Sequence, residues 1–371
     1  MSLIEEVNQK AFNLGLPLSV HLDVTYRCNE RCEHCYLDHD DHGEMKTEEI
    51  RGLLRQLQAA GVFFLTLSGG EPLVRRDCFE IIEYARSLGF QVKLKSNAVL
   101  IRKKDAARLR TLGVGEVQVS VYSHRPEIHD GITKLPGSLD RTLEGIAHLR
   151  SAGIKVILAN VLMKGNVQDS DGVHALAGEI GAQYTLDPTI TPMLSGDTSV
   201  LNLRIPGAKL NEIFHKSNLV GDVEKFCAPP PPVDDDVLDG FPCSAGHTAC
   251  YISPYGDVYP CVQFPLTCGN IRKQPFLEIW QDSPQLKEVR SIHARDLTTC
   301  SSCSHVGSCT RCPGLAFMEG DMRGPSSADC EKSFVRTGIT SAGMMAKQSA
   351  LAALVQIAPL NSHSASFHGG A

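Results

Sequence analysis

Fourteen cysteines occur in this chain of 371 residues, and most of them fall in two groups. The first group is Cys28, Cys32 and Cys35. Thiolates at such short spacing converge easily on one soft metal centre, either an iron–sulfur cluster or zinc. A zinc site would be completed by a histidine, and the candidates are His34, His39 and His42. A cluster held by three cysteines would instead leave one iron without a protein ligand, and an open iron can do chemistry.

The elements that must position these thiols are visible from about residue 17 to residue 190, where short β-rich runs alternate with amphipathic helical stretches. The predicted strands are Leu18–Val24, Val62–Leu67, Phe90–Lys95, Glu116–Val121, Lys155–Leu162 and Gln183–Leu186. The predicted helices are Thr47–Ala60, Asp77–Leu88, Asp105–Leu112, Leu139–Ala152 and Val173–Ile180. Each helix ends at a glycine that tolerates a left-handed cap, namely Gly61, Gly89, Gly113, Gly153 and Gly181. This alternation predicts an α/β fold with a parallel sheet, and six units fit a partial (β/α)6 TIM-like barrel.

In such folds the chemistry gathers at the carboxyl ends of the strands. Cys28 follows the first predicted strand, and the segment Gly69-Gly70-Glu71-Pro72 follows the second. Paired glycines let the backbone approach a ligand closely, and Glu71 can accept a hydrogen bond from an ammonium group. Taken alone, the segment favours an ordinary glycine-rich turn.

The second group of cysteines comprises Cys243, Cys250, Cys261, Cys300, Cys303, Cys309, Cys312 and Cys330. Eight thiols are enough for two four-thiolate sites, either iron–sulfur clusters or zinc ribbons. The segment before them contains Pro229–Pro232 and Asp234–Asp236, which predict an extended spacer and a domain boundary. Of the remaining thiols, Cys78 falls in a helix and is expected to pack, while Cys227 and Cys268 are spare thiols or substitute ligands.

Charge and composition narrow the class of protein. Lysine and arginine number 36 against 42 acidic residues, so the net charge of −6 provides no basic field for nucleic acid. The first 18 residues carry Glu5, Glu6 and Lys10 and no uninterrupted apolar run, so neither a signal peptide nor a membrane span is expected there. We therefore expect a cytoplasmic protein, in which clustered thiols stay reduced and bind metal.

The spacing Cys28-x3-Cys32-x2-Cys35 after the first strand, with Gly69 to Pro72 after the second, resembles the radical S-adenosylmethionine (radical SAM) enzymes. In that family the three cysteines hold a [4Fe-4S] cluster, and its free iron binds the methionyl group of S-adenosylmethionine. The resemblance implies contacts with S-adenosylmethionine for His34, Gly69, Gly70, Glu71, Pro72, Asn97 and Ser120. It assigns no side chain as a catalytic acid, base or nucleophile.

The second group of cysteines resembles the SPASM extension of the same family, a Cys-rich domain that binds two auxiliary [4Fe-4S] clusters. The resemblance implies a first auxiliary cluster on Cys243, Cys250, Cys261 and Cys312, and a second on Cys300, Cys303, Cys309 and Cys330. The interval between Cys309 and Cys312 holds two residues where the family usually has three. The implied domains are an N-terminal extension (1–16), the radical SAM partial barrel (17–221), a Pro/Asp-rich linker (222–240), the SPASM domain (241–332) and a C-terminal helix with a tail (333–371).

The resemblance implies an oxidoreductase-type enzyme that reductively cleaves S-adenosylmethionine to a 5′-deoxyadenosyl radical and abstracts hydrogen from a peptide or small protein, as in ribosomal peptide maturation. Relatives that modify haem or quinone precursors share the cysteine pattern and give one alternative. A non-catalytic iron–sulfur or zinc-binding electron carrier gives another. The implied partners are the peptide, an electron donor such as flavodoxin or ferredoxin, and a separate leader-peptide-binding protein, with neither nucleic acid nor membrane.

Overall fold

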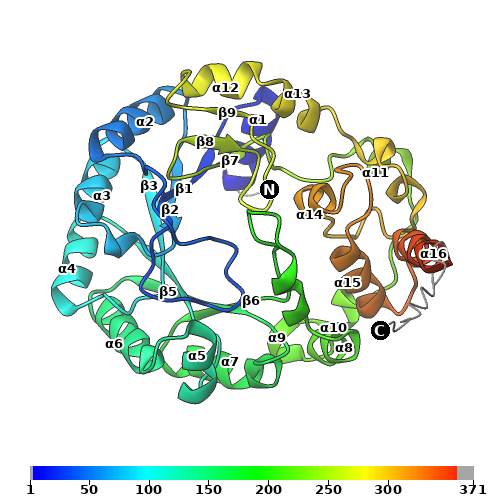
Figure 1. The fold of residues 1–371 in the computed structure, drawn as a ribbon, viewed down its shortest axis with the longest axis horizontal. Coiled ribbons are helices and arrows are strands. Elements are labelled where there is room, and N and C mark those ends of the chain that lie inside the picture. The colour runs from blue at the N-terminus through cyan, green and yellow to red at the C-terminus, as the bar shows by residue number, and fades with distance from the viewer. Residues whose placement is uncertain (1–2, 357–371) are drawn as a thin grey trace, which may run out of the picture.

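The computed structural model describes residues 3–356, which form a barrel-like sheet wrapped by helices and a helical region beside it (Figure 1). The sheet has nine strands in the order β6-β5-β4-β3-β2-β1-β7-β8-β9. The first six are β1 (Ser19–Thr25), β2 (Phe64–Gly69), β3 (Gln91–Ser96), β4 (Glu116–Ser120), β5 (Lys155–Val161) and β6 (Gln183–Asp187). Neighbours among these six all pair in parallel. The predicted partial barrel is confirmed, and each strand lies within two residues of its expected bounds.

Five helices alternate with these strands and cover the outside of the sheet (Figure 1). They are α2 (Thr47–Ala59), α3 (Cys78–Ser87), α4 (Lys103–Thr111), α6 (Ser138–Ser151) and α7 (Ser170–Glu179). The five glycines predicted to end them have φ values between 64° and 91°. Only glycine adopts this left-handed conformation without strain, so the regular glycines are the reason that each helix stops and the chain turns back to the sheet.

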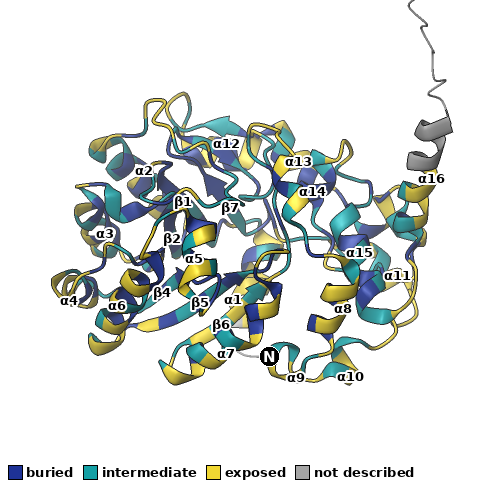
Figure 2. Ribbon diagram, turned by 60° about the horizontal axis from the view of Figure 1, so that its bottom comes forward, coloured by how far each residue is buried: buried dark blue, intermediate teal, exposed yellow. Residues whose placement is uncertain are grey.

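Side-chain alternation along the strands divides the sheet into two faces. Val20, Leu22 and Val24 of β1 are at most 1% exposed and pack in the main apolar core with the leucines of α2 and with Cys78 of α3. Figure 2 shows the strands as the most buried part of the barrel, while the helices expose their outer sides. Each fully buried leucine or valine contributes about 1.5–3 kcal/mol to folding. The residues between them, such as His21 and Asp23, face the inside of the barrel, where the site is built.

The sheet continues across the predicted domain boundary. β7 (Ala249–Ile252) pairs in parallel with β1, and β8 (Asp257–Tyr259) and β9 (Gly269–Asn270) follow in antiparallel order. The helices α12 (Phe276–Asp282) and α13 (Pro284–Arg290) cover this extension, and the indole of Trp280 donates to Gly15 O at 2.7 Å, just after α1 (Leu3–Leu14). The start of the predicted SPASM domain thus completes the barrel sheet.

The remaining helices are α5 (Pro126–Thr133), α8 (Gly207–Phe214), α9 (Ser217–Val220), α10 (Val223–Phe226), α11 (Asp235–Asp239), α14 (Pro313–Met318), α15 (Ser327–Thr337) and α16 (Ala342–Gln356). Except for α5, which lies against the barrel, they follow β6 along the chain, and α11 and α14 to α16 build the helical region (Figure 1). The acidic triplet Asp234–Asp236 is exposed as expected, yet it starts α11, because the Asp234 carboxylate accepts from Val237 N at 2.9 Å. The predicted tail lies outside the described residues. Among residues 3–356, no helix is long and apolar enough to cross a membrane.

Candidate functional site

A cavity of about 470 Å³ lies inside the barrel, at the carboxyl ends of the strands. Cys28, Cys32 and Cys35 all line it, so the structure brings the first cysteine group together at one wall. Burial raises the pKa of Cys28 to about 12 and raises the pKa of Cys35 above its usual range. The neighbouring Cys35 thiol adds to the rise at Cys28. Three adjacent half-buried thiols ionise together only when a positively charged centre binds them, which is what a metal cluster supplies.

The two glycines after β2 are required by a close approach of two backbones. A Cβ atom on Gly69 would lie 2.0 Å from Thr25 O, and one on Gly70 would lie 2.4 Å from Arg27 O. Gly70 N donates to Thr25 O at 2.8 Å, and Glu71 N donates to Arg27 O at 3.0 Å. Because these residues have no side chain, the cysteine loop packs closely against the end of β2. Both glycines also line the cavity.

Gly69 and Gly70 line the cavity, whereas Glu71 and Pro72 lie behind its wall. The Glu71 side chain is fully buried and accepts hydrogen bonds from Leu73 N at 3.0 Å, Ser96 Oγ at 3.0 Å and Asn97 N at 2.8 Å. Burial raises its pKa to about 7, against these hydrogen bonds. Its carboxylate joins the turn after β2 to the end of β3, so Glu71 positions the wall of the site from behind.

His34, Asn97 and Ser120, for which the resemblance implies contacts with S-adenosylmethionine, line the cavity. Burial lowers the pKa of His34 to about 4, so the ring is neutral, and it contacts the Tyr122 ring edge-to-face at 4.8 Å. The Asn97 amide donates to Asn29 Oδ1 at 2.9 Å. Asn29 Nδ2, Glu30 Oε1 and His34 Nδ1 are buried without a hydrogen-bond partner. Unpartnered polar atoms beside three thiols fit a polar ligand with amine, carboxylate and ring nitrogen groups, as in S-adenosylmethionine.

The sequence analysis missed the opposite wall of the cavity. Lys95 of β3 and Asp187 of β6 line it, together with the neutral polar side chains Gln118, Asn160, Thr185, Thr189, Thr191 and Gln263. Burial lowers the pKa of Lys95, while the carboxylates of Asp23 and Asp187 oppose that change. The sequence signal for this wall was the presence of polar residues at every second position of otherwise apolar strands, which points them into the barrel.

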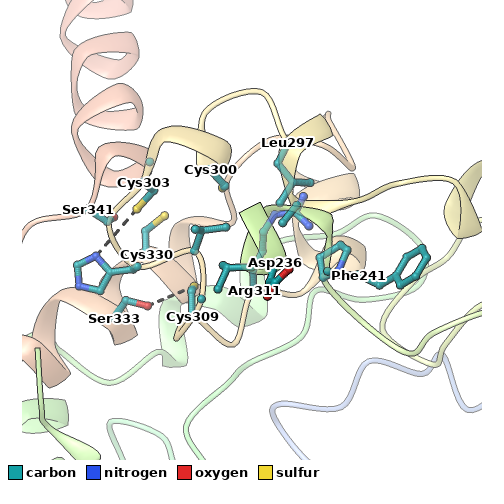
Figure 3. A pocket seen from close by; sticks show the side chains of 18 residues that line it. Asp236, Phe241, Leu297, Cys300, Cys303, Cys309, Arg311, Cys330, Ser333 and Ser341 are labelled. Carbon is teal, nitrogen blue, oxygen red and sulfur yellow. Dashed lines mark hydrogen bonds between the residues drawn. The ribbon is translucent and has the colours of Figure 1, made fainter. Parts of the chain in front are cut away.

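A second cavity, of about 280 Å³, lies in the helical region and is lined by Cys300, Cys303, Cys309 and Cys330 (Figure 3). These are the four cysteines that the SPASM resemblance assigned to one auxiliary cluster. The Ser333 hydroxyl donates to Cys309 Sγ at 3.3 Å, and His305 Nδ1 lies 3.9 Å from Cys303 Sγ.

Arg311 provides a buried positive charge beside this four-cysteine pocket (Figure 3). It is 7% exposed, and its Nη1 atom has no hydrogen-bond partner. Burial raises the pKa of Cys300, and the Arg311 guanidinium opposes the rise. Four thiols and a buried guanidinium whose hydrogen bonds go to backbone oxygens fit an anionic iron–sulfur cluster.

The four cysteines that the resemblance assigns to the first auxiliary cluster, Cys243, Cys250, Cys261 and Cys312, differ in their surroundings. Burial raises the pKa of Cys261, Cys312 and Cys250; the Cys243 thiol adds to the rise at Cys261, and the Cys261 thiol adds to the rise at Cys312 and at Cys250. Cys312 Sγ lies 4.0 Å from the side chain of Gln263, two residues after Cys261, so the shortened interval leaves Cys312 near Cys261. Cys250 is different: it is 3% exposed and belongs to the apolar core between the sheet and the outer helices.

Comparison with known proteins agrees with this geometry. Residues 22–176 match the radical SAM superfamily, and residues 243–313 match an iron–sulfur cluster-binding domain named SPASM. The chain is 34% identical over 333 residues to Fe-coproporphyrin III synthase of Methanosarcina barkeri, covering 81% of this chain and 82% of that protein. It is 28% identical over 331 residues to mycofactocin maturase MftC of Mycobacterium tuberculosis, covering 86% and 83%.

The fold resembles that of Streptococcus suis SuiB in a crystal structure with its precursor peptide SuiA. The TM-score is 0.69 at 18% sequence identity, covering 87% of this chain and 78% of SuiB. The two matched domains imply [4Fe-4S] clusters and S-adenosylmethionine as cofactors. Taken with the cavity and its three thiols, the sequence identity assigns the chain to the radical SAM superfamily, as an enzyme with a SPASM domain.

Proposed function

We propose that this radical SAM enzyme modifies a peptide during its maturation. The main supporting observation is that few charged side chains line the cavity. Apart from histidines, the charged side chains that line the cavity are Glu30, Lys95 and Asp187. The rest of the lining away from the cysteines is uncharged, with amide and hydroxyl groups next to the apolar side chains of Val161, Leu186 and Ile190. Such a wall suits the alternating donors and acceptors of a peptide backbone.

An iron porphyrin is the second candidate, because Fe-coproporphyrin III synthase is 34% identical to this chain. Porphyrins of that class carry several carboxylates, which need cationic partners when they leave water. Among the described residues, Lys95 is the lone lysine on the cavity wall, and no arginine lines it. The wall charge therefore favours the peptide. An electron carrier has no use for this cavity.

The chain's own residues orient the reactants and exclude water. When bound, the cluster and S-adenosylmethionine supply one-electron cleavage of a carbon–sulfur bond and hydrogen-atom abstraction. Gly69 and Gly70 hold the cysteine loop against β2, and Glu71 fixes the end of β3 behind them. Lys95 and Asp187 offer opposite charges to the substrate from two strands.

Mass spectrometry after anaerobic turnover tests the proposal. Short peptides encoded near the gene and iron coproporphyrin are incubated separately with enzyme, S-adenosylmethionine and reductant. We expect 5′-deoxyadenosine together with one of two changes in the peptide. A crosslink or desaturation lowers the peptide mass by two hydrogen atoms. An epimerisation leaves the mass unchanged in normal water and adds deuterium in heavy water. A changed porphyrin with every peptide unaltered would overturn it. The Cys32→Ala variant serves as the control that forms neither product.

The proposal includes two partners. A ferredoxin or flavodoxin supplies the electron, and a separate small protein binds the leader of the peptide. Pull-down with the tagged full-length enzyme, in the presence and absence of the peptide, measures both associations.

A further inference from the structure

The direction of the Cys250 side chain follows from the strand register. β7 pairs with β1 so that Val20 lies opposite Cys250 and His21 lies opposite Tyr251. The Tyr251 hydroxyl donates to Asp23 Oδ2 at 2.9 Å on the inner face, where His21 lines the cavity. Neighbouring residues of a strand point to opposite faces, so Cys250 points outward, toward the helices.

The surroundings of Cys250 are those of a packing residue. Its core neighbours include Ile252, Val258, Trp280 and Leu286. Cys268 belongs to the same apolar core and is 5% exposed, so it is placed with Cys250 and not with the inward-facing thiols. Among the hydrogen bonds of residues 3–356, none involves the Cys250 sulfur, although the Cys261 thiol is near enough to interact with it electrostatically.

Cys243, Cys261 and Cys312 have the opposite character. Ala245 N donates to Cys243 Sγ at 3.4 Å, and Leu315 N donates to Cys312 Sγ at 3.5 Å. The backbone at Gln263 donates to Cys261. The same kind of bond occurs in the barrel loop, where Glu30 N lies 3.4 Å from Cys28 Sγ. Donated N–H groups stabilise sulfur that carries negative charge, as a metal-bound thiolate does.

We propose that the first auxiliary cluster of this chain is held by three cysteines, Cys243, Cys261 and Cys312, with Cys250 outside its ligand set. One iron of that cluster then has no protein thiolate and can exchange an external ligand. Val262 and Gln263, directly after Cys261, line the barrel cavity, and Gln263 Oε1 lies 4.0 Å from Cys312 Sγ. The ligands Cys261 and Cys312 of this cluster therefore adjoin the barrel cavity. This inference does not depend on which substrate is modified.

Iron content of two matched variants tests the ligand set. After anaerobic reconstitution, the parent enzyme should bind about twelve iron atoms in three cubane clusters. Cys250→Ala should keep that content, whereas Cys261→Ala should lose about four iron atoms. Equal iron losses in the two variants would overturn the proposal.

A second measurement does not require that a Cys250 variant folds. The full-length variant with Cys28, Cys32 and Cys35 all replaced by Ala lacks the barrel cluster and keeps both auxiliary sites. Carbon-13-labelled cyanide, added to this reduced protein, should give a hyperfine coupling to one auxiliary cluster in electron–nuclear double resonance. The absence of any coupling at saturating cyanide would contradict an exchangeable iron.

Discussion

The barrel cavity and the four-cysteine pocket of the helical region are both lined by cysteines, but they differ in the number of thiols and in the groups around them. In the barrel, three thiols share a wall of about 470 Å³ with glycines, neutral polar groups and unpartnered polar atoms. In the helical region, four thiols enclose about 280 Å³, with Ser333 bonded to one sulfur and Arg311 buried beside another. The barrel cavity leaves room for a ligand beside a cluster. The four-cysteine pocket offers a cluster four protein thiols.

This difference indicates that the number of thiol ligands and their surroundings determine whether a cluster binds a ligand or stores electrons. A cluster with an open iron needs space and unpaired polar groups nearby, because its ligand must enter and leave. A fully ligated cluster needs charge compensation and hydrogen bonds to sulfur, because these set its reduction potential.

The largest expected effect comes from removing a thiol of the barrel. Cys32→Ala should lower the rate of 5′-deoxyadenosine formation by more than about 100-fold, because even outer partners of metal ligands cost about 10–100-fold. Chromatography of the nucleoside after anaerobic turnover measures the rate. Cys227→Ala is the control, since Cys227 lines neither cavity. Comparable rates for the parent and Cys32→Ala would remove the barrel from the chemistry.

The next effect tests the close approach that shapes the barrel wall. Gly70→Ala places a Cβ atom 2.4 Å from a backbone oxygen, and such overpacking costs about 1–3 kcal/mol in the free energy of unfolding. Gly115→Ala is the matched control, because nothing lies within 4 Å of its added Cβ atom. Denaturant unfolding under nitrogen compares the two. If both variants are equally stable, the backbone contact carries no constraint.

Glu71 gives the barrel wall a pH dependence of its own. Burial raises its pKa from 4.5 to about 7, so the folded chain keeps a proton that the unfolded chain releases. The free energy of unfolding therefore falls as pH rises from about 4.5 to about 7. The fall should be smaller in Glu71→Gln, and it should be unchanged in Glu80→Gln, whose side chain is exposed. Thermal unfolding across this range measures the slopes; identical slopes in parent and Glu71→Gln would refute the assignment.

The smallest effect sharpens the account of the enclosed cluster. Ser333→Ala removes a hydrogen bond to Cys309 Sγ that stabilises the more negative, reduced cluster. A loss of about 1 kcal/mol corresponds to a midpoint potential about 40 mV lower for one electron. Ser302→Ala is the control, since Ser302 donates to Thr299 O outside the pocket. A redox titration followed by electron paramagnetic resonance would show whether only Ser333→Ala shifts the potential.

Local signals predicted much of this architecture. The glycines that end the helices and the apolar alternation of the strands placed the six parallel units, and the spacing of Cys28, Cys32 and Cys35 identified the cluster loop. The helix α5 was missed, because it begins at Pro126 soon after β4 and has few apolar positions.

Long-range contacts explain what the sequence alone could not predict. Cys250 faces the core because β7 pairs with β1, more than 200 residues earlier, and its face depends on that register. Glu71 was expected at the ligand, but its partners Ser96 and Asn97 come from a neighbouring strand end. Lys95 and Asp187 meet at one cavity only once the sheet curves.

The central claim, an open cluster on the barrel thiols, is tested most directly by electron paramagnetic resonance of the reduced enzyme before and after S-adenosylmethionine is added. The account predicts that S-adenosylmethionine changes the spectrum of the parent enzyme and leaves that of Cys32→Ala unchanged. An unaltered parent spectrum, or the same change in Cys32→Ala, would contradict it.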